Sequence, residues 1–342
     1  MKRFKGFEHG INLGGWLSQC DHTKERYDNF IKEEDIKRIA SWGLDHVRLP
    51  IDYELIEKDS GEYIEEGFTY IDKAIEWTKR NGLNMILDLH KTCGFSFDFG
   101  ENEAGFFDNE KLQERFYRLW EELAKRYGNV GDSLAFELLN EVTDKAFCEK
   151  WNQICGMCIS RIRKIAPNVK ILIGGYWNNS IESLPALMLP PDENIVYNFH
   201  CYEPLIFTHQ GAPWIRTMDT SFRIPITASY KELKAASDKY LEQVTVSVED
   251  FDPDSSLSSA YFEKYFNEAV RIAEERNVPL YCGEYGVIDR TAPAEILGWY
   301  KMISKEFNRC GIGRAAWSYK EMDFGFIDDY MAPVLDEIIK EL

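Results

Sequence analysis

The sequence has little positive charge and no long apolar segment. Its 342 residues contain 40 lysines and arginines against 58 aspartates and glutamates, so the formal net charge is −18. A chain this acidic is a poor partner for the phosphate backbone of nucleic acid or for an anionic membrane, whereas neutral or cationic small molecules and neutral polymers remain open as ligands. No stretch approaches the roughly 18 apolar residues of a membrane-spanning helix. We therefore expect no nucleic-acid partner and no membrane partner.

The first residues lack the pattern of an export signal. Residues 1–6 carry three basic side chains, but no apolar stretch follows before Glu8 and His9. A secretory signal peptide needs an apolar region of about 7–15 residues after its charged start. We expect a cytoplasmic protein from the chain as written, or a secreted one if a leader has been removed.

Metal, redox and phosphate-binding motifs are also missing. Cys155 and Cys158 form a C-x-x-C pair, but no second cysteine or histidine pair lies near them, and their neighbours have the spacing of an apolar helix face. No H-x-H or H-E-x-x-H spacing occurs, and the glycine-rich segment 6–16 does not match G-x-G-x-x-G. We expect both cysteines to be buried on a helix, and we expect no metal ion and no cofactor.

What the sequence does contain is a regular alternation of short apolar runs and amphipathic segments. The hydrophobic fraction of 44% is enough for a full core. Strands alternating with helices predict a parallel sheet, and eight such units predict an α/β fold of the closed (β/α)8 TIM barrel type, with residues 1–342 as a single catalytic domain. The predicted strands lie at 6–16, 44–50, 83–90, 133–136, 169–175, 195–200, 278–283 and 312–317, and the helices include 33–42, 68–80, 110–127 and a last one at 334–342.

The alternation breaks once, after the sixth predicted strand. Residues 203–259 contain scattered aromatics, prolines and acids without a clear period. A structureless loop of this length is uncommon in a compact domain. We therefore predict an inserted subdomain at 203–259.

Two of the predicted strands deliver a glutamate. The run at 133–136 leads directly into Asn140 and Glu141, and the run at 278–283 leads into Glu284. A buried strand is an expensive place for a carboxyl group unless the group is used. We expect the barrel to bring Glu141 and Glu284 together as a carboxylate pair.

Polar or aromatic residues end the other strands as well. Active sites of TIM barrels lie at the C-terminal ends of the strands. A single polar strand end is more often a satisfied structural group, but six of them together favour a site. The residues at these ends, besides the two glutamates, are Arg48, His90, Asn140, His200, Tyr202 and Trp317.

Two glutamates without metal ligands around them indicate glycoside hydrolysis. One carboxylic acid protonates the leaving oxygen, and the other attacks the anomeric carbon or activates water. Arg48 and the Tyr202 hydroxyl would keep the attacking carboxylate ionised. Asn140 is suited to bind the sugar 2-hydroxyl, and Trp317 offers a flat face for a pyranose.

Three other tryptophans are candidates for outer sugar subsites. They are Trp16, Trp177 and Trp214, and for each of them packing in the core explains the residue type equally well.

Other chemistries on the same fold have less support. A metal site would need His90 and His200 together with acidic side chains as ligands. A Schiff-base mechanism would need a lysine among apolar residues at the end of a strand, and no strand end shows one, because Lys91 follows His90 in a polar loop. A carbohydrate-binding barrel that has lost catalysis is a further alternative, although both glutamates are present.

The ordered motifs identify a family resemblance. They resemble glycoside hydrolase family 5, and the insertion after strand six with its His209-Gln210 pair is most similar to the clostridial endoglucanase C type. The motifs span nearly the whole chain, at residues 10–16, 46–50, 88–90, 138–141, 198–202, 283–286 and 316–319.

The resemblance implies a retaining mechanism without a cofactor. Glu141 matches the acid/base of the family and Glu284 its nucleophile, and the six other strand-end residues match the subsite that holds the sugar being cleaved. Retention predicts carboxyl groups about 5–5.5 Å apart. The expected activity is that of a monomeric endo-β-1,4-glucanase (cellulase) acting on a β-glucan oligo- or polysaccharide.

Departures from the family pattern lie in the loops that shape the cleft. They are residues 91–94, the loop 95–107 with Glu101 and Glu103, and Cys201 where an aromatic is frequent. The first motif is also shared with exo-acting β-1,3-glucanases. An exo-β-1,3-glucanase, a β-mannanase and a mixed-linkage glucanase therefore stay open as alternatives.

Overall fold

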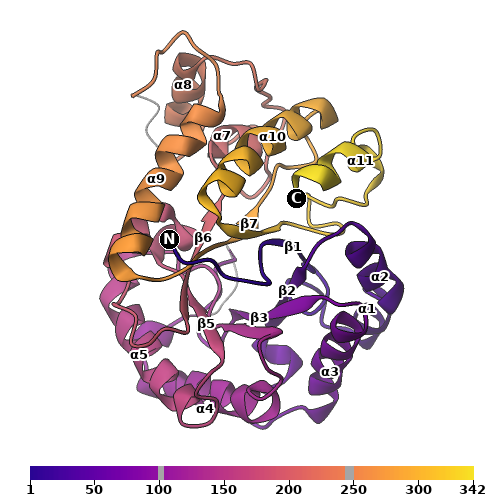
Figure 1. The fold of residues 1–342 in the computed structure, drawn as a ribbon, viewed down its shortest axis with the longest axis vertical. Helices are drawn as coiled ribbons and strands as arrows, with labels where there is room; N and C mark the ends of the chain where they lie inside the picture. Colours follow the sequence, from indigo (N-terminus) through magenta and orange to yellow (C-terminus); the bar gives the residue numbers. More distant parts are fainter. Residues whose placement is uncertain (99–103, 243–249) are drawn as a thin grey trace.

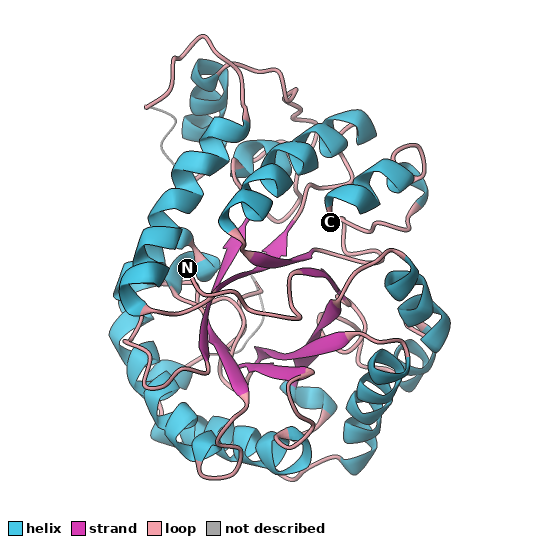
Figure 2. Cartoon of the chain, viewed as in Figure 1, coloured by secondary structure: helices cyan, strands magenta, loops and turns pink. Residues whose placement is uncertain are grey.

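The protein is a closed barrel of eight parallel strands inside a ring of helices (Figures 1 and 2). The computed structural model describes residues 1–98, 104–242 and 250–342. The predicted (β/α)8 TIM barrel is therefore confirmed. Neighbouring strands pair in chain order and β1 pairs with β8, the strands being β1 His9–Asn12, β2 His46–Asp52, β3 Asn84–Lys91, β4 Leu134–Glu137, β5 Lys170–Ile173, β6 Ile195–Cys201, β7 Leu280–Tyr285 and β8 Gly313–Ala316.

The long helices each bury one apolar face against the rest of the protein. In α4, the predicted helix 110–127, Phe116, Leu119 and Leu123 form such a stripe, and all three are buried. The longer helices are α2 Glu33–Ser41, α3 Glu65–Arg80, α4 Glu110–Tyr127, α5 Cys148–Arg163, α8 Tyr230–Tyr240, α9 Ser259–Arg276 and α10 Pro293–Cys310, and the short ones are α1 Lys24–Asn29, α6 Tyr176–Asn179, α7 Leu205–Thr208 and α11 Leu335–Ile338.

Two details of the helix prediction can be compared with the structure directly. Cys155 and Cys158 are both fully buried on α5, as expected for a structural helix face. The last predicted helix, 334–342, is shorter than expected, because α11 ends at Ile338 and the chain continues as a 3₁₀ turn, Ile339–Glu341. Short helices are marginal in stability.

The segment inserted after β6 contains α7 and α8. Helix α8 begins with a capping box, in which the Ser229 side chain accepts from the Glu232 backbone and the Glu232 carboxylate accepts in return. Figure 1 shows α8 beyond one end of α9. Phe207, Tyr230 and Leu233 join the same apolar cluster as the barrel helices. The division into one domain and an inserted subdomain at 203–259 stays a prediction. Residues 243–249 of this segment lie outside the described residues, and so do Glu101 and Glu103 of the loop 95–107.

One end of the barrel is filled by apolar side chains. Phe4 and Phe7 precede β1 and pack in one cluster with side chains from inside the barrel, among them Ile86 and Tyr281. The N-terminal end of the strands is therefore plugged, which leaves the C-terminal end for a cleft. No helix of the described residues is long and apolar enough to cross a membrane.

Candidate active site

A cleft of about 540 Å³ lies at the C-terminal end of the strands. It contains the two strand-end glutamates and four of the six other strand-end residues. These lining residues are Glu141, Glu284, His90, His200, Tyr202 and Trp317. Arg48 and Asn140, which are 0% and 1% exposed, are not among the lining residues and form the floor of the cleft.

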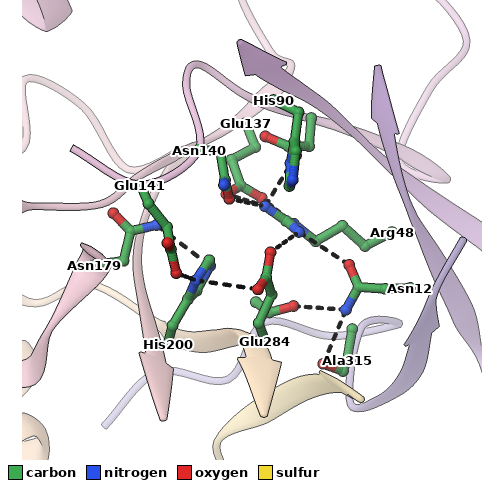
Figure 3. A network of polar contacts seen from close by, with 12 residues as sticks. Asn12, Arg48, His90, Glu137, Asn140, Glu141, Asn179, His200, Glu284 and Ala315 are labelled. Atoms are coloured by element: carbon green, nitrogen blue, oxygen red, sulfur yellow. Dashed lines mark hydrogen bonds and ion pairs between the residues drawn. The ribbon is translucent and has the colours of Figure 1, made fainter. Parts of the chain in front are cut away.

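The two glutamates face each other across the cleft. Figure 3 shows the carboxyls of Glu141 and Glu284 pointing toward each other, with His200 beside both. One oxygen of Glu141, one of Glu284 and a ring nitrogen of His200 all lie within 4.8 Å of one another. Glu141 follows the end of β4 by four residues, whereas Glu284 lies within β7, where a register shift pairs it with His200 of β6. The expected pairing of the two carboxyls is present.

Glu284 is held as a carboxylate. Burial on its own raises the pKa of the Glu284 carboxyl, but the positive charges of His200, Arg48 and His90 and the hydrogen bond from Tyr202 outweigh it, so that the pKa lies below its ordinary value. Arg48 Nη1 donates to Oε1 over 2.8 Å, and the Tyr202 hydroxyl donates to Oε2 over 2.8 Å. Each oxygen thus has a donor from the protein.

Arg48 is the buried cation of the site. Its guanidinium donates to both oxygens of Glu137, over 2.7 and 2.9 Å, and contacts Asp88 at 3.0 Å in addition to Glu284. Burial lowers the pKa of the Arg48 guanidinium, but the three acids raise it well above its usual value. Two amide oxygens complete the arrangement in Figure 3, those of Asn12 at 3.0 Å and Asn140 at 2.8 Å. All of the hydrogen-bonding edges of the guanidinium are therefore used to fix the floor of the cleft.

Glu141 is held by two donors on different elements. His200 Nδ1 donates to Oε1 over 2.7 Å, and Asn178 Nδ2 donates to Oε2 over 2.7 Å. Burial lowers the pKa of the His200 imidazole, but the negative charges of Glu284 and Glu141 raise it above its ordinary value. His200 therefore serves both glutamates, since its Nδ1 also lies 3.6 Å from Glu284 Oε2.

His90 and Trp317 form one wall. The two rings stack in parallel with their centroids 5.7 Å apart. His90 Nδ1 lies 2.6 Å from Asp88 Oδ2, and its Nε2 lies 3.3 Å from Gln19 Oε1. Both ring nitrogens face oxygen acceptors, so both are satisfied only in the doubly protonated ring. Burial lowers the pKa of His90, but the neighbouring Asp88 raises it above the ordinary value.

The outer tryptophans separate into two groups. Trp177 and Trp214 line the cleft, and Trp214 is 42% exposed. Trp16 is a core residue instead, and its prediction as an outer subsite is corrected. Its ring is fully buried, stacks on Trp77 at 6.0 Å and donates its Nε1–H to the Tyr27 carbonyl. A side chain without exposed surface cannot present a face to a sugar.

Several residues of the site were not singled out from the sequence. Asp88 and Asn198 lie two residues before His90 and His200, on the same strand face, so the period of two was the available signal. Glu137 ends β4 in the barrel interior, where the Asn198 amide also donates to it. Asn178 and Gln19 lie in loops, where no periodicity marks them.

Among the described residues, two groups of side chains have the geometry to hold a metal ion. They are Glu141, His200 and Glu284 in the cleft, and His22, Asp52 and Glu54 beside it. In the first group all four carboxylate oxygens already accept hydrogen bonds from protein donors. In the second, His22 lies 3.4 Å from Asp52, and Lys91 lies 2.8 Å from Glu54. Protein donors thus occupy the carboxylate oxygens of the first group, whereas in the second group Asp52 Oδ1 and Glu54 Oε2 are buried without a hydrogen-bond partner among the described residues. The absence of a metal stays a prediction.

The geometry is that of a buried carboxylate pair on a barrel, and a family model agrees with it. The model described as cellulase (glycosyl hydrolase family 5) matches residues 6–323. The chain belongs to glycosyl hydrolase family 5. The resemblance drawn from the sequence motifs is thereby confirmed, and this family 5 member is an enzyme that hydrolyses glycosidic bonds.

Relatives of this glycosyl hydrolase cover most of its length. Cellodextrinase A of Ruminococcus flavefaciens is 51% identical over 314 residues, which are 92% of this chain and 86% of that protein. Endoglucanase C of Acetivibrio thermocellus is 38% identical over 344 residues, with 98% of each chain covered. The structure of endoglucanase Cel5A from Thermotoga maritima matches with a TM-score of 0.77 at 24% identity, over 99% of this chain and 98% of that one, which shows the shared fold.

Proposed function

We propose that this family 5 glycoside hydrolase is a retaining endo-β-1,4-glucanase. The observation that carries the proposal is the proximity of Glu141 and Glu284, which have carboxylate oxygens within 4.8 Å of each other. Retaining glycosidases hold their carboxyl groups about 5–5.5 Å apart, whereas inverting enzymes leave about 6.5–9.5 Å for a water molecule. The names of the endoglucanase and cellodextrinase relatives support a β-linked glucan as substrate.

The reaction consists of two displacements. In the first, a Glu284 oxygen attacks the anomeric carbon while Glu141 gives its proton to the glycosidic oxygen, so that the C–O bond breaks and a glycosyl ester of Glu284 forms. In the second, Glu141 takes a proton from water, the water oxygen bonds to the anomeric carbon, and the ester bond to Glu284 breaks. Glu141 is then protonated again, and the product keeps the configuration of the substrate.

The surroundings of the two carboxyls support this division of roles. Glu284 accepts from Arg48 and Tyr202 and has a lowered pKa, as a nucleophile requires. The Asn140 amide nitrogen is buried and has no hydrogen-bond partner among the described residues, so it is available as a donor to the 2-hydroxyl of the bound sugar. Such a bond gains strength as the oxocarbenium-like transition state forms.

An endo mode of action is supported by the aromatic side chains of the cleft. Trp317 offers a face beside the glutamates, and Trp177 and Trp214 extend the aromatic lining on two further segments. Rings in this arrangement bind successive sugar units of a longer chain. We also propose that the enzyme acts as a monomer, since both catalytic glutamates and the residues that hold them come from one chain.

A product profile tests the proposal. Wild type and Glu141→Gln are incubated with cellulose derivatives, mixed-linkage glucan, β-1,3-glucan, glucomannan and cellodextrins, with and without EDTA. Oligomers from β-1,4-glucan polymers with wild type alone, unchanged by EDTA, are the expected result. Monosaccharide as the sole product would indicate an exo enzyme, and cleavage of cellodextrins without polymers would indicate a cellodextrinase. Binding without any product would indicate a carbohydrate-binding barrel.

Azide separates the roles of the two glutamates. We expect Glu284→Ala to lose turnover and to form a glycosyl azide of inverted anomer when azide replaces the nucleophile. Glu141→Ala should give a glycosyl azide of retained anomer, because azide then attacks the glycosyl ester without a general base. The same anomer from both variants would contradict the assignment.

A further inference from the structure

The segment after β5 contains three consecutive residues with a left-handed backbone. The φ angles of Trp177, Asn178 and Asn179 are 50°, 56° and 56°. Residues other than glycine rarely adopt this conformation, although asparagine tolerates it better than most. Backbone strain of this kind persists only where the surroundings hold it, and it is concentrated at functional sites. We refer to these residues as the 177–179 turn.

Close packing against the barrel holds the turn in place. The Asn178 N–H donates to the Val142 carbonyl over 3.0 Å, and the Asn179 N–H donates to the Gly175 carbonyl over 3.2 Å. A Cβ atom on Gly174 would lie 2.1 Å from Asn179 Oδ1, so the glycine leaves the space that the turn fills. On its inner side the Asn179 amide lies 3.3 Å from His200 Nε2.

The turn is attached to the acid/base segment at two points. Besides the bond from its backbone to Val142, Asn178 donates from its side chain to Glu141 Oε2 over 2.7 Å, and it lines the cleft. Figure 3 shows Asn179 and His200 beside Glu141, and His200 holds the other oxygen of the same carboxyl. Rotation of the Glu141 side chain therefore requires both contacts to break.

We propose that Asn178 is a positioning residue for Glu141, which orients the carboxyl for proton transfer and stabilises it once the proton has left. The proposal rests on the function proposed above, since it concerns the acid/base step of that reaction. When Glu141 protonates the glycosidic oxygen, it becomes a carboxylate in a buried place. The side-chain amide of Asn178 already donates to Oε2 and stabilises that charge. The left-handed turn is what brings an amide from the β5 loop to this oxygen.

A change of leaving group tests this role. A natural β-1,4 linkage needs a proton from Glu141, whereas 2,4-dinitrophenolate departs without one. We expect Asn178→Gly, which accepts the left-handed backbone but lacks the amide, to lower kcat/KM for cellotetraose by about 10- to 100-fold. Its kcat/KM for 2,4-dinitrophenyl β-cellobioside should change by less than about threefold, because that quantity reports only the formation of the glycosyl ester.

Asn178→Asp distinguishes the hydrogen bond from the shape of the side chain. Aspartate has the same size but donates no hydrogen bond, and its charge lies next to Glu141. We expect the same loss on cellotetraose and an alkaline limb of kcat/KM that moves to higher pH, because two adjacent carboxyls do not ionise together easily. A change in packing alone would leave that limb in place.

Asn277→Gly is the matched control. Asn277 also has a left-handed backbone, with φ of 55°, but it lies at the C-terminal end of α9, away from the cleft. It should leave both rates unchanged. Equal losses on both substrates in Asn178→Gly would overturn the positioning role while leaving the proposed function intact. A wild type that cleaves neither substrate would overturn the proposed function, and the positioning role with it.

Discussion

Arg48 and Glu284 form a buried ion pair in which Nη1 donates to Oε1 over 2.8 Å, and the arginine has no exposed surface. The pair does not stand alone, because the same guanidinium also contacts Glu137 and Asp88. The charge on the nucleophile and the packing of the barrel floor are therefore properties of one network. Removing the arginine should affect both.

Substitution of Arg48 is expected to alter stability and the pH profile together. Arg48→Met leaves three acids near a cavity without their cation, so the free energy of unfolding should fall by about 3–5 kcal/mol. In Arg48→Lys the fork-shaped contacts are lost, the pKa of Glu284 rises, and the acid limb of kcat/KM moves to higher pH. Chemical denaturation and pH–rate profiles measure the two effects. Arg80→Met, at an exposed surface pair, is the control and should change neither.

Glu182 should make stability depend on pH near neutrality. Burial raises the pKa of Glu182 to about 7, and the nearby negative charge of Glu203 adds to the effect. Between the ordinary value near 4.5 and about 7, the unfolded chain releases this proton before the folded protein does, so wild type loses stability as pH rises through this window. Glu182→Gln keeps a side-chain oxygen that accepts from Tyr265, but its amide does not titrate in this pH range. Its melting temperature should exceed that of wild type at pH 8 and equal it below pH 4.5.

Gly174 is expected to matter for activity because of the 177–179 turn. A Cβ atom in Gly174→Ala would meet the Asn179 side chain at 2.1 Å and displace the turn from Glu141. We expect kcat/KM on cellotetraose to fall about 10- to 100-fold. Gly156→Ala, on α5, meets nothing closer than Met188 at 3.6 Å. That control should keep full activity and gain about 0.5–1 kcal/mol of stability, and equal activities of the two variants would contradict the prediction.

Trp16 and Trp214 should respond to substitution in opposite ways. Trp16→Ala leaves a cavity in the core and should cost about 3–5 kcal/mol, with the milder Trp16→Phe as a variant that keeps the fold. Neither should change the product pattern of the enzyme that remains folded. Trp214→Ala should leave the melting temperature nearly unchanged and raise KM for long cellodextrins more than for short ones. A raised KM in Trp16→Phe would instead indicate that Trp16 takes part in binding the sugar in the cleft.

The sequence by itself determined the barrel and the two glutamates. Strand runs such as 195–200 and the helix 110–127 carry local periodicities that survive folding unchanged, because each element buries one face against the same core. Eight such units have one common closed arrangement. The ends of parallel strands then meet at one face, which is why the sequence predicts that Glu141 and Glu284 lie together.

The tertiary structure decided which side chains surround those glutamates. Trp16 and Trp214 have the same chemistry in the sequence, and only packing places one in the core and the other in the cleft. Asn178 reaches Glu141 through a left-handed turn that no periodicity encodes. Glu137 and Asp88 belong to the site only because the buried guanidinium of Arg48 forms ion pairs with both of them. These contacts join residues far apart in sequence, and their energies depend on burial that exists only in the folded chain.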